Sequence, residues 1–307
     1  MITRFAPSLT GYLHLGHVLH MLYVWGIAKA KGADIVSRIE DHDLGRARPE
    51  YESAILETME WLGFIPTLGI SSADEGFSSD YRQSDCADHY AEVLTTLEKN
   101  GRVYGCGCSR KQIRESSAGG MPSSASAVSG DAVPPVMGDE LCYSGTCSGK
   151  GLPLEGNTVR FRVPESEVVF NDLKLGECRQ TPSEQCGDFS LRDRNAQWTY
   201  QFCCVCDDIR HSVDLVIRGE DILSSTARQI QLFHALEKPV PTYFHHPLLR
   251  DESGNKLSKR QHSESISQLR EAGVLPEEII GKTLFQAGLA PTGEFISRHN
   301  AIENYII

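Results

Sequence analysis

The sequence predicts an α/β protein with a parallel, doubly wound sheet, an inserted subdomain and a helical C-terminal segment. Short apolar stretches alternate with amphipathic helical patterns in the first 65 residues, the order typical of a parallel sheet built from strand–helix–strand units. This alternation returns after residue 188, and many turn-forming residues lie between the two regions. The last seventy residues have mainly helical patterning.

The elements of the first half follow from apolar periodicity. Residues 1–6 read as a strand, and residues 14–31 have one apolar face and read as a helix that stops at Gly32. A second short strand over residues 33–40 and a second amphipathic helix over residues 49–62 follow. This succession is the start of a parallel α/β sheet.

The second half is less regular. A Ser-, Ala-, Gly- and Pro-rich stretch at 116–137 reads as a flexible excursion. The expected later elements are strands at 158–163, 168–170 and 215–218, a buried helix or strand at 198–206, and a helix at 224–236. The predicted domains are a split α/β domain of residues 1–100 and 188–240, an insertion at 101–187, and a C-terminal segment at 241–307.

Composition excludes several classes of protein. The chain has 307 residues, 40% of them hydrophobic, with 30 Lys and Arg against 41 Asp and Glu for a net charge of −11. This is globular composition rather than that of a disordered chain, and the acidic balance is unlike that of a protein that coats nucleic acid. Apolar runs fall short of the ~18 residues of a membrane span, and the N-terminus lacks an export signal. We expect a cytoplasmic protein that acts as a monomer away from membranes.

Two histidines mark the start of the first predicted helix. His14, Gly16 and His17 form an H-x-G-H pattern at the point where the loop enters the helix. A helix N-terminus attracts phosphate, histidines three apart can face one anion, and glycine allows a nucleotide to approach the backbone. Surface or capping histidines are the alternative.

A basic loop lies in the last third of the chain. Lys256, Ser258 and Lys259 follow a turn that contains Gly254. Such a loop can close over a triphosphate and stabilise the charge that develops as pyrophosphate leaves. A solvated surface loop is the alternative for the basic segment taken by itself.

Together the two motifs are the signatures of class I aminoacyl-tRNA synthetases, and further segments resemble the glutamyl-tRNA synthetase group. The resemblance covers roughly residues 1–110 and 155–265 and implies a Rossmann-type fold; Leu9 departs from it, where the family usually has proline. The segments that carry it, in the expected order, are Arg4-Phe5-Ala6-Pro7-Ser8, Thr10-Gly11, Arg38-Ile39-Glu40-Asp41, Gly187-Asp188-Phe189, Tyr200-Gln201, Ile217-Arg218-Gly219-Glu220-Asp221 and His246-Pro247-Leu248.

The resemblance implies a glutamate pocket. Arg4 and Arg218 stand at the ends of predicted strands, and their guanidinium groups would bind carboxylates and reject a neutral amide. Glu40 would hold the α-ammonium group, with neutral hydrogen bonds from Ser8 and Tyr200. Structural salt bridges at the strand ends are the alternative.

The implied reaction is attack of the glutamate carboxylate on the α-phosphate of ATP, which gives glutamyl-adenylate and pyrophosphate. This chemistry depends on alignment and charge neutralisation. The candidate catalytic residues are His14, His17, Lys256 and Lys259, and ATP would be bound by His14, Gly16, His17 and Lys259 with Mg²⁺ on the phosphates.

A cysteine-rich pattern in the insertion predicts a structural zinc site. Cys106, Cys108 and Cys147 supply three thiolates, and the resemblance to the zinc-binding insertion of the glutamyl-queuosine tRNA(Asp) synthetases gives Tyr143 as the fourth ligand. Cys142 is a rival for that place, and free thiols are the alternative, because the two halves of the pattern are further apart than is usual in the family. The remaining clustered cysteines read as core residues: Cys203, Cys204 and Cys206.

The molecule that accepts the activated glutamate is predicted from the length of the chain after the basic loop. Only 47 residues follow Arg260, too few for an anticodon-binding domain of roughly 100 residues. The resemblance therefore favours the short glutamyl-queuosine tRNA(Asp) synthetases, which attach glutamate to the queuosine base in the anticodon of tRNA(Asp). The alternatives are a truncated glutamyl-tRNA synthetase that charges the 3′ end of tRNA(Glu), a nucleotidyltransferase acting on another acid, and an inactive zinc-containing module that binds RNA or protein.

Overall fold

The computed structural model describes residues 1–70, 79–117, 141–249 and 264–306. The chain forms two compact units, the first made of Met1–Cys86, His211–Glu220 and Tyr243–Ile307, the second of Ala87–Arg210 and Asp221–Thr242. These units group the residues differently from the predicted domains, whose limits stay a prediction. Among the described residues, no helix combines the length and apolar character that crossing a membrane requires.

A parallel sheet organises the first unit. Strands β1 (Ile2–Phe5), β2 (Asp34–Ser37) and β3 (Leu68–Gly69) pair in parallel in that order. Strand β9 (Leu215–Gly219) lies beside β1, because the N–H of Asp214 donates to the carbonyl of Ile2 at 3.1 Å, and β10 (Thr242–His246) pairs with β9. The predicted α/β class with a parallel sheet is confirmed.

Helix α1 (Leu15–Lys31) carries the core of this unit. All residues from Val18 to Ala28 are buried except His20, and the helix ends at Gly32 in a left-handed conformation, φ 62°, which glycine adopts without steric cost. Helix α2 (Pro49–Trp61) begins with proline at its first turn, where the missing N–H is not needed.

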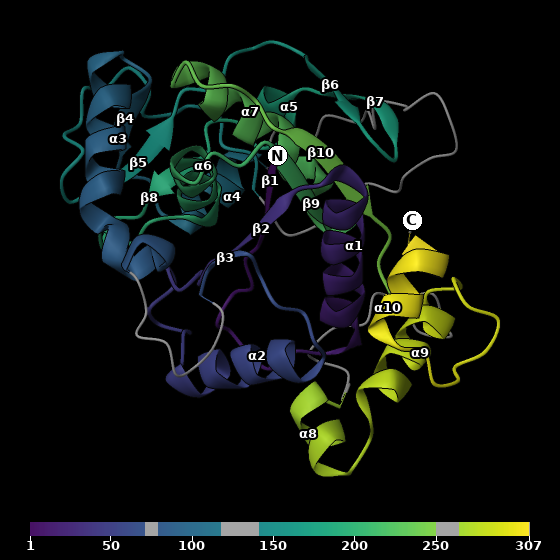
Figure 1. The fold of residues 1–307 in the computed structure, drawn as a ribbon. Helices are drawn as coiled ribbons and strands as arrows, with labels where there is room; N and C mark the ends of the chain where they lie inside the picture. Colours follow the sequence, from purple (N-terminus) through teal and green to yellow (C-terminus); the bar gives the residue numbers. More distant parts are fainter. Residues whose placement is uncertain (71–78, 118–140, 250–263, 307) are drawn as a thin grey trace. The chain divides into compact units, whose positions relative to one another are not determined.

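The C-terminal segment is helical from residue 266. Figure 1 shows α9 and α10 beside α1, and Lys29 of α1 forms an ion pair with Glu303. The expectation of a mainly helical segment omits β10. Its helices are α8 (Ile266–Glu271), α9 (Pro276–Gln286) and α10 (Arg298–Ala301), followed by a π-helical turn (Ile302–Ile306).

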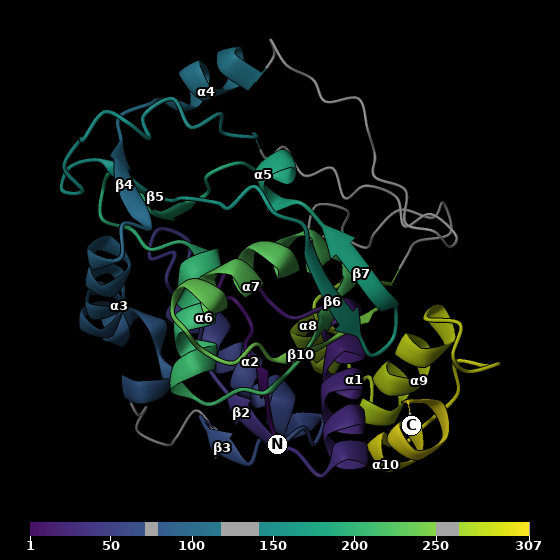
Figure 2. The same cartoon turned by 90° about the horizontal axis from the view of Figure 1, so that it is seen from above.

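The second unit combines antiparallel strand pairs with helices. Strand β5 pairs with both β4 and β8, and β6 pairs with β7; Figure 2 shows α6 and α7 side by side. The segment 198–206, predicted as helix or strand, belongs mostly to helix α6, and its three cysteines are at most 1% exposed, as predicted for core residues. The elements are α3 (Ala87–Lys99), β4 (Val103–Cys106), α4 (Arg110–Ser117), β5 (Thr158–Phe161), β6 (Val168–Asp172), β7 (Gly176–Gln180), α5 (Pro182–Gln185), β8 (Ser190–Arg192), α6 (Tyr200–Arg210) and α7 (Thr226–Ala235).

Candidate active site and candidate zinc centre

The two histidines of the H-x-G-H pattern cap helix α1 reciprocally. His14 is the N-cap residue and its Nδ1 accepts from the N–H of Gly16 at 3.1 Å, while Nδ1 of His17 accepts from the N–H of His14 at 3.1 Å. Because both Nδ1 atoms accept, hydrogen bonding assigns the proton of each neutral ring to Nε2. The histidines therefore do cap the helix, and their role toward phosphate stays a prediction; in this tautomer each ring also has an Nε2–H donor at a helix start without an acidic residue in its first turn.

Sequence reasoning missed a histidine pair one turn further along α1. Nδ1 of His20 lies 3.0 Å from Nε2 of His246, and Nδ1 of His246 lies 2.9 Å from the carbonyl of Pro247. The second bond places a proton on Nδ1 of His246, so its Nε2 accepts from His20. Burial, reinforced by His246 and Arg4, lowers the pKa of His20 well below 6.5. The three-residue spacing from His17 to His20 was visible in the sequence, but the partner 226 residues away was not.

The low pKa of His20 predicts acid sensitivity. In the unfolded chain His20 binds a proton near pH 6.5, whereas in the folded chain it stays neutral at that pH because its pKa is lower. The free energy of unfolding therefore falls as the pH drops below 6.5. Between pH 7.5 and 5.5 we expect the free energy of unfolding to fall less in His20→Gln than in wild type. The difference is up to ~1.4 kcal/mol per pH unit. Urea unfolding measures it, with exposed His299→Gln as the control. Equal losses in wild type and His20→Gln would contradict the assignment.

The two arginines predicted to bind glutamate lie on neighbouring strands of the first unit. Arg4 of β1 is 5% exposed and Arg218 of β9 is 3% exposed. Arg4 donates from Nη1 to the carbonyl of Ile217 at 3.2 Å, and Arg218 donates from Nε to Nε2 of His245 at 3.0 Å. The structure therefore places both cationic groups on strands that contact each other, although β1 and β9 belong to different hydrogen-bonded sheets.

Ser8 and Glu40 lie on adjacent segments that continue β1 and β2. They form a parallel bridge, and the N–H of Leu9 donates to the carbonyl of Glu40 at 3.5 Å. The Glu40 carboxylate accepts from Nη2 of Arg38 at 3.0 Å, and both side chains are buried. The backbones of residues 8 and 40 are thus adjacent, while the Ser8 side chain is exposed and the Glu40 carboxylate is buried against Arg38.

The remaining predicted residues are distributed differently. Tyr200 is the first residue of α6 and belongs to the second unit. Lys256 and Lys259 lie outside the described residues, as does the 118–137 part of the stretch predicted to be flexible.

Three thiols in the second unit form a candidate metal centre. The sulfurs of Cys106, Cys108 and Cys147 all lie within 4.8 Å of one another, and Cys108 and Cys147 are 3.5 Å apart. Thiolates that share one zinc at about 2.3 Å lie about 3.8 Å apart, so the cluster fits zinc. Although burial alone would raise it, hydrogen bonds with Tyr143, the Gly107 backbone and Cys108 lower the pKa of Cys147 to about 7, which favours the ligating thiolate near neutral pH.

Of the two candidates for the fourth ligand, Tyr143 lies beside the three thiols and Cys142 faces other groups. Oη of Tyr143 lies 3.2 Å from Sγ of Cys106 and 3.8 Å from Sγ of Cys108, and it accepts from the N–H of Cys147 at 2.9 Å. Sγ of Cys142 faces the carbonyls of Ser183 and Glu184 instead, at 3.8 and 3.7 Å. The geometry therefore groups Tyr143 with the three thiols.

A polar network supports this tyrosine. The guanidinium carbon of Arg160 lies 3.7 Å from the centre of the Tyr143 ring, and Nη1 of Arg160 donates to the carbonyl of Asp188 at 2.6 Å. The Asp188 carboxylate accepts from the hydroxyl of Tyr104 at 2.5 Å. Gly187 adopts φ 62°, and a Cβ there would meet the carbonyl of Tyr143 at 2.0 Å, so only glycine permits the backbone contact between the two segments.

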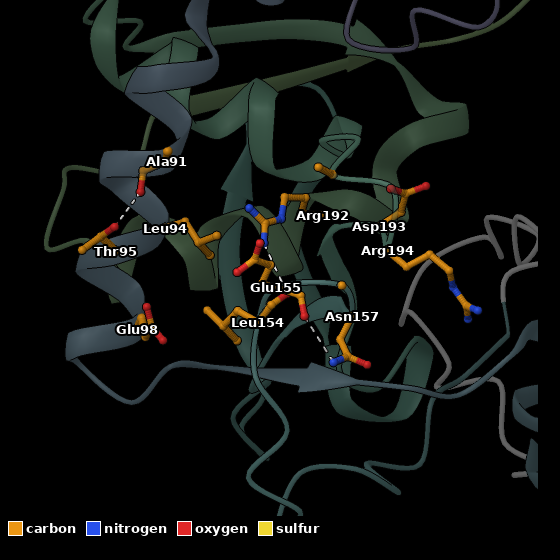
Figure 3. Close-up of a pocket in the computed structure, with 12 residues that line it drawn as sticks. Ala91, Leu94, Thr95, Glu98, Leu154, Glu155, Asn157, Arg192, Asp193 and Arg194 are labelled. Atoms are coloured by element: carbon orange, nitrogen blue, oxygen red, sulfur yellow. Dashed lines mark hydrogen bonds between the residues drawn. The ribbon is translucent and has the colours of Figure 1, made fainter.

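A cavity of about 440 Å³ lies elsewhere in the second unit. Figure 3 shows Arg192 between the side chains of α3 and the turn that holds Asn157, with its Nη2 donating to the carbonyl of Leu154 at 3.3 Å. None of the residues predicted to bind glutamate, ATP or zinc lines it.

Comparisons with known proteins show the family to which the chain belongs. A family model described as "tRNA synthetases class I (E and Q), catalytic domain" matches residues 1–306. The chain is 37% identical to the Glutamyl-Q tRNA(Asp) synthetase of Nitratidesulfovibrio vulgaris, over 96% of this chain and 88% of that protein. It is 35% identical to the glutamate–tRNA ligase of Verminephrobacter eiseniae, over 91% of this chain but only 55% of that protein.

Among solved structures, the chain is similar to the glutamate–tRNA synthetase of Elizabethkingia anophelis, with a TM-score of 0.77 and 27% identity. The match covers 99% of this chain and 65% of that one, so the chain spans a little less than two thirds of its length. The chain therefore belongs to the class I tRNA synthetases of the glutamate and glutamine group, and it is a ligase.

Proposed function

We propose that the enzyme activates L-glutamate with ATP and transfers the glutamyl group to the queuosine base in the anticodon of tRNA(Asp) in the cytoplasm. The observation that carries this proposal is the similarity to relatives of that name. The chain is 37%, 35% and 34% identical to three proteins named Glutamyl-Q tRNA(Asp) synthetase, over 91–96% of its length.

By the resemblance, glutamate binding is assigned to Arg4, Ser8, Glu40, Tyr200 and Arg218. The guanidinium groups of Arg4 and Arg218 bind carboxylate, and neutral glutamine forms weaker bonds with them. The Glu40 carboxylate binds the α-ammonium group, and the hydroxyls of Ser8 and Tyr200 supply neutral hydrogen bonds. Because the two arginines and Glu40 are 6% exposed or less, water screens these charges weakly.

ATP binding is assigned to the start of α1. The Nε2–H groups of His14 and His17 donate to phosphate oxygens, aided by the partial positive charge of the helix N-terminus. Mg²⁺ bound with ATP supplies further charge neutralisation. An oxygen of the glutamate carboxylate then bonds to the α-phosphorus as the bond to the pyrophosphate oxygen breaks, and Lys256 and Lys259 stabilise the charge on the leaving group.

The tight packing of Gly16 gives a test of this assignment. A Cβ at Gly16 would meet Cε1 of His14 at 2.8 Å and its Nδ1 at 3.0 Å, so Gly16→Ala must displace the ring that both caps the helix and donates to phosphate. We expect ATP affinity to fall by roughly tenfold, the equivalent of one hydrogen bond to a charged group.

Equilibrium titration with ATP measures the effect of Gly16→Ala. The matched control is Gly149→Ala, because a Cβ there meets nothing within 4 Å. If Gly16→Ala binds ATP with the affinity of wild type, the assignment of His14 to the ATP site is wrong.

The zinc centre is assigned a structural role. Cys106, Cys108, Tyr143 and Cys147 would fill all four positions of a tetrahedral ion and leave none open for substrate. No catalytic step is assigned to it, and its contribution is to hold the insertion in shape.

A transfer assay tests the acceptor. Labelled glutamate, ATP and enzyme are incubated with tRNA(Asp) that carries queuosine or guanosine in the anticodon, each with and without its 3′-terminal adenosine. The proposal requires labelling of both queuosine tRNAs and of neither guanosine tRNA.

Two other outcomes identify the alternatives. Labelling of tRNA(Glu) that depends on the 3′-terminal adenosine indicates a glutamyl-tRNA synthetase. Absence of glutamate-dependent pyrophosphate exchange into ATP, measured with tRNA present, indicates an inactive RNA- or protein-binding module.

A further inference from the structure

His245 holds one of the two glutamate-binding arginines from the neighbouring strand. Its Nε2 accepts the N–H of Arg218 Nε at 3.0 Å, and His245 is fully buried while Arg218 is 3% exposed. The ring of Tyr243, two residues earlier on β10, lies with its centre 5.3 Å from the guanidinium carbon. Strand β10 therefore fixes the orientation of an arginine that belongs to β9.

The bond to His245 is made by a neutral acceptor. An imidazole nitrogen accepts a hydrogen bond only through a lone pair, so Nε2 of His245 carries no proton and the ring is uncharged. Carboxylates, by contrast, are the acceptors in the bonds from buried Arg38 to Glu40 at 3.0 Å and from partly buried Arg82 to Glu52 at 2.9 Å. The bond from Arg218 to His245 restricts the guanidinium, and this acceptor itself adds no negative charge.

We propose that His245 is a positioning residue that makes Arg218 selective for an acidic ligand, an inference that rests on the proposed binding of glutamate. A carboxylate in place of His245 would orient Arg218 equally well but would neutralise it and oppose a second carboxylate. An apolar side chain would leave the guanidinium charged but less restricted, with a buried N–H left unsatisfied. The uncharged acceptor satisfies both needs.

Three variants separate charge from orientation. His245→Gln keeps a neutral acceptor, His245→Glu has the same size and adds a negative charge, and His245→Met has no comparable acceptor. Glutamate-dependent pyrophosphate exchange into ATP, with queuosine tRNA(Asp) present, gives the KM for glutamate, the KM for ATP and kcat. The KM for glutamine gives the discrimination, and His299→Gln, an exposed histidine, is the control.

The three variants are expected to differ in their KM for glutamate in an order that a residue needed only for folding would not produce. His245→Gln keeps the glutamate KM within about threefold, His245→Met raises it about tenfold, and His245→Glu raises it about 100-fold and lowers discrimination against glutamine, with the ATP KM unchanged. The inference about His245 would be wrong if His245→Gln and His245→Glu had equal KM values for glutamate, or if His245→Met had the KM of wild type. Either result would leave the proposed function intact. Absence of exchange in the wild type would overturn the proposed function and the inference with it.

A measurement on the wild-type enzyme guards against variants that do not fold. In ¹⁵N-labelled protein, the coupling across an N–H···N hydrogen bond should connect Nε of Arg218 with a histidine ring nitrogen, and Arg218→Lys assigns the signal. A resolved Arg218 signal with no such coupling would overturn the inference.

Discussion

Arg4→Gln is expected to lower kcat/KM for glutamate in the pyrophosphate exchange by about 10²- to 4 × 10³-fold, with the KM for ATP little changed. The buried guanidinium of Arg4 is one of the two cations assigned to bind the carboxylates of glutamate. Removing one partner of a buried charge pair costs about 3–5 kcal/mol, and every 1.4 kcal/mol corresponds to about tenfold.

Controls separate the loss of binding from the loss of structure. Arg4 also donates to the carbonyl of Ile217, so thermal unfolding of Arg4→Gln must be followed in parallel. Arg4→Lys keeps the charge but not the planar fork and should fall between wild type and Arg4→Gln. Arg46→Gln removes an exposed arginine that pairs with Asp43 on the same unit and should have no effect. A wild-type kcat/KM in folded Arg4→Gln would exclude Arg4 from the glutamate pocket.

Cys147→Ala is expected to abolish stoichiometric zinc binding and to destabilise the second unit. Cys147 is 2% exposed and its sulfur lies in the three-thiol cluster. Because the free energy of binding a structural zinc ion contributes to folding, a missing ligand should also lower the melting temperature. Metal analysis of the purified protein and release of zinc to a chromogenic chelator give the stoichiometry.

The neighbouring cysteine provides a matched control for the zinc centre. Cys142→Ala removes a thiol that faces the carbonyls of Ser183 and Glu184, so one zinc per chain should remain. Tyr143→Phe should retain zinc with lower affinity, because the three thiolates persist. Zinc lost from Cys142→Ala but kept in Cys147→Ala would show that the ligand set is wrong.

Apolar periodicity predicts an element correctly when the buried residues of that element form one continuous pattern in the sequence. Helix α1 has both a continuous apolar pattern and a glycine at its end, and the structure places its limits at Leu15 and Lys31. Strand β10, with the sequence Thr-Tyr-Phe-His-His, has no such pattern. Its two histidines are buried because Arg218 and His20 bond to them from other elements, and no local pattern encodes these contacts.

The candidate site divides in the same way. A short motif predicts the H-x-G-H start of α1 and the C-x-C half of the zinc centre, because the residues concerned are close in sequence. The position of Arg218 beside β1 depends on the order of strands, and its bond to His245 depends on pairing between β9 and β10. Tyr143 lies beside the thiols while Cys142 faces Ser183 and Glu184, a difference that spacing alone does not reveal.

The imidazole caps of α1 set a limit on engineering this enzyme for heat resistance. Asp, Asn or Ser at an N-cap stabilises a helix, and such replacements are worth up to about 2 kcal/mol. At His14, however, the replacement would remove an N–H donor, and aspartate would add negative charge to the helix start that has no acidic residue. Helix α2 offers a safer position, because its N-cap residue, Arg48, makes no side-chain capping bond. Thermostability should therefore be sought at Arg48, where catalysis and helix stability do not compete.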